Sequence, residues 1–157
     1  MAKHKIDISY SQICIFHSNM ENPFNDWTVQ HIKQGFSWRA GSVSFKTLLD
    51  YGKVDVNISI VNRIQIDPLS TRIISVPLTV NEDNTLEIAS ITDSITLKIK
   101  PGLYIVVYET GYKDKDIWIK LSFQPTKEIL PPEIVKVDEE LEPEYPLIME
   151  AKPAANI

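Results

Sequence analysis

The sequence contains few of the residues that enzymes and secreted domains use for chemistry and covalent stabilisation. It has one cysteine, five glycines and three histidines among 157 residues. The lone Cys14 cannot form an intrachain disulfide, and its apolar surroundings at residues 13–16 indicate a packed thiol. The glycines form no phosphate-binding loop, and His4, His17 and His31 lack the spacing of a metal pair. We therefore expect no enzymatic activity, no catalytic residue, no metal and no cofactor.

Excess positive charge and long apolar runs are also missing. The formal net charge is −5, which disfavours direct binding to nucleic-acid phosphates. No stretch approaches the ~20 consecutive apolar residues that a membrane helix needs. Residues 1–6 are polar and charged, unlike the apolar core of a signal peptide. These absences predict a cytoplasmic protein with no transmembrane segment and no direct contact with nucleic acid.

What the chain does contain is a succession of alternating apolar and polar residues. Val54, Val56 and Ile58 alternate with polar neighbours, which is the period of a half-buried strand. β-Branched residues, abundant throughout, favour strands. The pattern predicts an all-β fold, an antiparallel β-sandwich of about eight strands. The strands are expected near residues 6–16, 43–49, 54–60, 74–80, 85–88, 95–99, 103–108 and 117–121.

One segment, residues 26–34, departs from the strand pattern and predicts a short helix. Asp26 is suited to cap its N-terminus, and Gly35 is suited to end it. We expect the helix to close one end of the sandwich. Its mixed apolar side would consist of Trp27, Val29, Ile32 and Phe36.

The C-terminal residues 125–157 form a tail of different composition. They hold six of the ten prolines, eight acidic residues and three lysines, so the tail accounts for the whole net charge of −5. Proline spacing argues against a helix or a core strand. Scattered apolar residues such as Leu141 and Ile148 favour an extended segment that docks on its own domain or on a partner. We therefore expect a β-sandwich domain at 1–124 and a proline-rich acidic tail at 125–157.

A set of short motifs in residues 6–123 resembles the competence protein J family. The first motifs are Ile8-Ser9-Tyr10 with Gln12, and Asp26-Trp27-Thr28 followed by Ile32 and Gly35. Gly41, Ser44 and Phe45 match the following strand of the family. Further along are Val76-Pro77 with Val80, Ile88 with Ser90-Ile91, and Pro101-Gly102 with Tyr104. The acidic tail departs from the family pattern.

The resemblance implies a non-enzymatic inhibitor that binds a DNA-entry nuclease and blocks DNA degradation. A chain of carboxylates could mimic the phosphates that a cationic nuclease groove binds. Aromatic side chains are common anchors of protein interfaces. The candidate partner-binding residues are Asp26, Trp27, Trp38, Asp138, Glu139, Glu140, Glu142 and Glu144.

Other interpretations of the same residues remain open. Asp26 also fits a helix cap, and the tryptophans also fit core packing. The tail acids also fit a solvated or loosely docked segment. The alternative function is a non-enzymatic β-sandwich interaction module of unrelated role, and a homo-oligomer is possible in either case.

Overall fold

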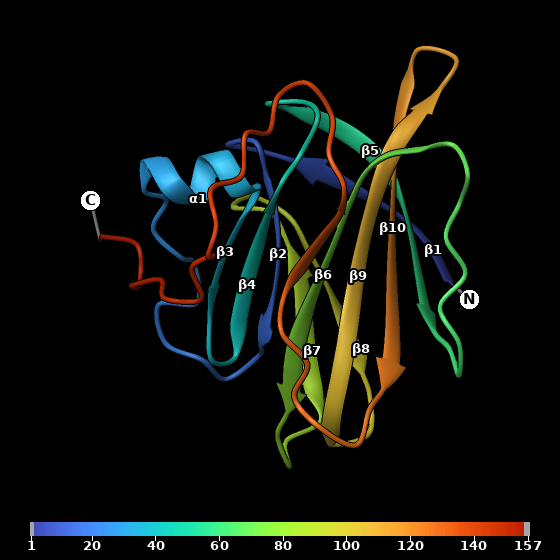
Figure 1. The fold of residues 1–157 in the computed structure, drawn as a ribbon. Helices are drawn as coiled ribbons and strands as arrows, with labels where there is room; N and C mark the ends of the chain where they lie inside the picture. Colours follow the sequence, from blue (N-terminus) through green and yellow to red (C-terminus); the bar gives the residue numbers. More distant parts are fainter. Residues whose placement is uncertain (1, 156–157) are drawn as a thin grey trace.

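The computed structural model describes residues 2–155, which form eleven strands and one short helix (Figure 1). The all-β class predicted from the alternating pattern is confirmed, with more strands than the eight expected. The strands are β1 (Ala2–Ile8), β2 (Gln12–His17), β3 (Phe36–Arg39), β4 (Ser42–Lys46), β5 (Gly52–Ile60), β6 (Ser70–Val80), β7 (Thr85–Ala89), β8 (Ser94–Lys98), β9 (Gly102–Lys113), β10 (Asp116–Pro125) and β11 (Glu133–Lys136). The helix is α1 (Val29–Gln34), and no helix of the described residues is long enough to cross a membrane.

The strands form two sheets. One has six strands in the order β1-β5-β10-β9-β6-β11, and the other has five in the order β3-β4-β2-β7-β8. Every strand pair of the described residues is antiparallel except β5 and β10, which run parallel. The expectation of purely antiparallel pairing is therefore wrong at this one place.

The apolar positions of both sheets meet in one core. Val54, Val56 and Ile58 of β5 are buried there, whereas Asp55 between them is exposed. Phe45 of β4, in the other sheet, stacks on Tyr108 of β9 with ring centroids 4.7 Å apart. The period-two pattern thus places the side chains of β5 as the sequence predicts.

The segment predicted as one strand at residues 6–16 is instead two strands in different sheets. Tyr10 and Ser11 separate β1 from β2, with φ of 54° and 58°. Consecutive residues in this left-handed region turn the chain sharply, and neither is the glycine that would announce such a turn. The corner therefore had no signal in the sequence.

The tail lies along the domain rather than away from it. In Figure 1 it leaves β10, runs up the molecule as an orange-red trace and descends beside α1. Its strand β11 pairs with Ile73, Ile74 and Ser75 of β6. Docking on its own domain, one of the two outcomes expected, is what the structure shows.

Candidate partner-binding surface

Helix α1 buries two of its polar side chains and exposes both of its apolar ones. His31 and Gln34 are buried, whereas Val29 and Ile32 are 70% and 45% exposed. The expected packing of Val29 and Ile32 against the domain is therefore wrong. The reason lies in the tail: Gln34 Nε2 donates to Ile148 O at 2.9 Å, and Ile148 N donates to Gln34 Oε1 at 3.0 Å. Turning these polar groups inward leaves the apolar residues of the helix on the surface.

The cap of this helix is Thr28, not Asp26. His31 N donates to Thr28 Oγ1 at 3.3 Å, and Thr28 N donates to His31 Nδ1 at 3.0 Å, which together make a capping box. Asp26 lies two residues too early. Its carboxylate accepts instead from Lys152 N at 3.0 Å, so it fastens the end of the tail. The C-terminal prediction is confirmed, because Gly35 adopts a φ of 84° at the C-cap.

The two tryptophans proposed as anchors have different surroundings. Trp38 packs against the core and donates from Nε1 to Pro77 O at 2.8 Å. Trp27 is half-buried, donates from Nε1 to Gln12 Oε1 at 3.1 Å, and lines a surface hollow. Part of the Trp27 ring is therefore available to a partner. Trp38 is held in place by its hydrogen bond to Pro77 and by packing against the core.

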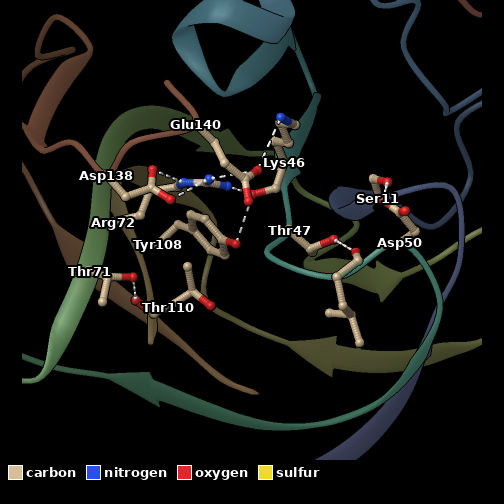
Figure 2. Close-up of polar contacts among 11 residues, drawn as sticks. Ser11, Lys46, Thr47, Asp50, Thr71, Arg72, Tyr108, Thr110, Asp138 and Glu140 are labelled. Carbon is tan, nitrogen blue, oxygen red and sulfur yellow. Dashed lines mark hydrogen bonds and ion pairs between the residues drawn. The ribbon is translucent and has the colours of Figure 1, made fainter. Parts of the chain in front are cut away.

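A buried arginine holds the middle of the tail (Figure 2). Arg72 is 0% exposed and donates from Nε and Nη2 to the two carboxylate oxygens of Asp138, at 2.9 and 2.8 Å. Its Nη1 donates to Lys46 O at 2.7 Å, an oxygen that also accepts from Tyr108 Oη. Burial alone would lower the pKa of Arg72, but the neighbouring carboxylates of Asp138 and Glu140 outweigh it, so the pKa is raised overall. The guanidinium therefore remains charged.

The tail carboxylates divide into paired and open groups. Asp138 is bound to Arg72, Glu140 lies 3.3 Å from Lys46 Nζ, and Glu144 lies 2.5 Å from Lys33 Nζ. Glu139 and Glu142 are exposed, and their side chains have no hydrogen bond or ion pair within residues 2–155. The structure thus separates tail acids that have a basic partner in the domain from Glu139 and Glu142, which have none among the described residues.

The sharp turn between β1 and β2 presents a second set of exposed residues. Tyr10 is 62% exposed and meets Tyr51 edge-on, with ring centroids 5.7 Å apart. A hollow of about 300 Å³ beside Tyr10 is lined by Ser11, Trp27, Ile32 and Lys46. We give the name corner surface to the exposed side chains of Tyr10, Val29, Ile32 and Tyr51 together with the half-buried Trp27.

Catalysis commonly uses metal-ligating or nucleophilic side chains, so those of this chain bear on its activity. Residues 2–155 hold no group of three or more metal-ligating side chains that could bind an ion. Cys14 is fully buried beside Ser44 Oγ, at 3.1 Å, and burial raises the pKa of its thiol to about 12. A buried neutral thiol is a poor nucleophile, so its role is packing.

Comparison with known proteins places this fold. The family model described as Competence protein J (ComJ) matches residues 5–124. The chain belongs to the competence protein J family. A similar solved structure is that of ComJ from Bacillus subtilis, described as an inhibitor of the DNA-degrading activity of NucA. The two chains are 20% identical with a TM-score of 0.69, over 80% of this chain and 96% of that one. A comparison of the sequence with curated proteins found no match.

The competence protein J match ends at residue 124, so the tail lies outside it. Two features of the surface were missed at the sequence level. Arg72 has the same phase as the buried Ile74 and Val76 of β6, so the alternation itself was the available signal. It was passed over because a charged side chain is rarely fully buried. The contact of Tyr10 with Tyr51 joins residues far apart in sequence, and the only available signal was the aromatic side chain itself.

Proposed function

We propose that this protein inhibits a DNA-degrading enzyme by binding to it, without chemistry of its own. The observation that carries the proposal is membership of the competence protein J family together with the structural similarity to an inhibitor of NucA. In this proposal the two sheets act as a β-sandwich scaffold of residues 1–124, and the contact takes place in the cytoplasm. The inhibitor binds the enzyme and leaves DNA free.

The proposed contact uses Trp27, which is half-buried, and the two sequence-predicted acids without a basic partner among the described residues, Glu139 and Glu142. Two other sequence-predicted residues have a structural role in this proposal. Asp26 binds the end of the tail, and Trp38 of β3 donates to Pro77 in the other sheet. Asp138, Glu140 and Glu144 hold the tail in place through ion pairs. We call the open carboxylates of Glu139 and Glu142 the acidic rim. Exposed charges of this sign speed association with a cationic surface.

The test is a DNA-digestion assay with a DNA-entry nuclease and the full-length protein at increasing concentration. We expect digestion to stop at a fixed protein-to-enzyme ratio, because inhibition occurs by complex formation. An inactive nuclease variant should bind the protein in calorimetry, and DNA alone should not. If the protein does not bind the inactive nuclease and does not slow digestion, the alternative of an unrelated interaction module is favoured.

A second experiment separates steering by open acids from docking of the tail. Replacing both Glu139 and Glu142 by Gln should slow association with the nuclease and flatten its salt dependence, because these charges are solvent-exposed. The matched control is Glu128→Gln, an exposed tail acid close to the end of β10. If the double variant and the control associate at the same rate, the acidic rim has no part in the contact.

A further inference from the structure

Tyr10 has a left-handed backbone conformation, which is unfavourable for a residue with a bulky side chain. Tyr10 and Ser11 both have positive φ, 54° and 58°, at the turn between β1 and β2. Two-residue turns of this kind favour Asn-Gly, because other L-residues are strained there. The Tyr10 side chain is 62% exposed, so burial in the core does not offset the strain. Strained residues that the surrounding structure maintains concentrate at functional sites.

The surrounding structure does maintain this turn. Ser11 N donates to Asp50 O at 3.1 Å, and Ser11 Oγ donates to Asp50 Oδ1 at 2.6 Å, as Figure 2 shows for the side chains. Thr47 N donates to Ser11 O at 2.9 Å. These bonds tie the turn to the segment before β5, where Tyr51 lies. The two exposed tyrosines are therefore held ready for contact, which lowers the entropy cost of binding.

The apolar residues around the tyrosines continue the same surface. Trp27 and Ile32 line the hollow beside Tyr10, and Val29 lies on the same helix. The tail turns the polar face of this helix inward and so leaves Val29 and Ile32 exposed. Aromatic and aliphatic side chains grouped on a rigid surface are typical of the centre of a protein interface.

Negative charge borders this apolar centre. The one cation that lines the hollow, Lys46, is paired with Glu140 at 3.3 Å. Asp50 is exposed at the turn, and the open carboxylate of Glu139 is next to Glu140 in the chain. An aromatic surface bordered by carboxylates suits a partner that presents Lys and Arg side chains, which pair with the acids and pack on tyrosine rings.

We propose that the corner surface is the anchor of the inhibitor and that it enters the cationic groove with which the enzyme binds DNA. The proposal rests on the proposed function and names the surface that carries it. A groove that neutralises phosphates must be lined by Lys and Arg, which is the chemistry that the corner surface fits. Binding there excludes DNA, so inhibition is competitive with the substrate.

The test compares Tyr10→Asn with Tyr112→Ala, an exposed tyrosine of the β9–β10 hairpin that is 48% exposed. Asn tolerates positive φ, so Tyr10→Asn should unfold at the same or a higher temperature than the parent protein. Its affinity for the inactive nuclease should nevertheless fall at least about tenfold, as for an interface anchor. Tyr112→Ala should bind as the parent protein does, and added DNA should displace the parent protein from the nuclease.

The outcomes distinguish this proposal from the proposed function. If the parent protein does not bind the nuclease, the proposed function fails. A second variant, Tyr51→Ala, removes the other exposed tyrosine of the corner surface. If the parent protein binds and both Tyr10→Asn and Tyr51→Ala bind as tightly, inhibition stands and the corner surface is excluded. Binding that DNA does not displace overturns the placement in the groove. A parent protein that forms dimers in sedimentation, lost in Tyr10→Asn, would instead make the corner a contact between copies of this chain.

Discussion

Arg72 shows how one residue connects the tail with both sheets. It lies in β6, and its side chain donates to Asp138 of the tail and to the carbonyl oxygen of Lys46 in β4. A guanidinium fully removed from water is strongly destabilising unless its donors are satisfied. Asp138 was one of the tail acids predicted to bind a partner. In the structure it binds Arg72 of its own domain instead.

Replacing Asp138 by Ala should lower the free energy of unfolding by about 3 kcal/mol, because it leaves a buried cation without its main partner. Urea denaturation measures this loss. The matched control is Glu139→Ala, which removes an exposed neighbouring acid and should change stability by less than about 0.5 kcal/mol. Adding Arg72→Met to Asp138→Ala should recover much of the loss. Equal stability of the two single variants would show that the ion pair contributes nothing.

Cys14 gives a second prediction for a single residue. Burial raises the pKa of its thiol to about 12 from 9.0. At pH 8 the thiolate fraction is then about a thousandfold smaller than in the unfolded chain, so a disulfide reagent should label the native protein far more slowly. A raised folded pKa contributes stability below pH 9 that is lost as the pH rises from 9 to 12. Cys14→Ala should lose less stability over this range, and rapid labelling of native protein would contradict the burial.

Helix α1 shows which features of an element could be predicted from the sequence. Its end at Gly35 followed from a local rule about positive φ, and the structure confirms it. Its predicted apolar side was wrong at Val29 and Ile32, because the pattern assumes that the domain covers the apolar residues, but right at Phe36, which is buried. Here the tail supplies partners for Gln34 and His31, which are polar. Contacts with a segment more than a hundred residues away have no signature inside the helix.

The cap of α1 provides a prediction that separates Thr28 from Asp26. Thr28→Ala removes the oxygen that accepts from His31 N and should lower the free energy of unfolding by about 1 kcal/mol. Asp26→Ala leaves the capping box intact and should lower it by less than about 0.5 kcal/mol, since it removes one exposed contact with Lys152 N. Thermal unfolding of both variants measures the difference. A larger loss for Asp26→Ala would restore it as the important residue.

At the scale of the whole molecule, the strands were predictable and their arrangement was not. Alternation in β5 and β8 depends only on which face is buried, so single-sequence patterns located these strands. The parallel pairing of β5 with β10 depends on the path of the chain between them, which no local pattern records. The same holds for the tail, whose composition indicated docking but not the groups that receive it.

The tail gives the last prediction, because it is fastened at several places, three of them before residue 142. Its strand β11 covers part of the edge of β6, Asp138 binds Arg72, and Leu141 is buried against Gly35 in the core. A chain ending at residue 124 loses all three. We expect it to lose about 3–5 kcal/mol of unfolding free energy, chiefly from the unpaired Arg72, and to self-associate through the open β6 edge.

A chain ending at residue 142 is the matched control, since it keeps β11, Asp138 and Leu141. It loses the contacts of residues 143–157 with α1 and residues 24–26, and the packing of Leu147 and Met149 against the core. It should remain monomeric in sedimentation and unfold within a few degrees of the full chain. The shorter chain should regain part of its stability when Arg72 is replaced by Met, because the buried charge is then gone. If the chain ending at 124 is as stable and monomeric as the full protein, the tail is an appendage. Its ion pairs would then hold it in position without supporting the domain.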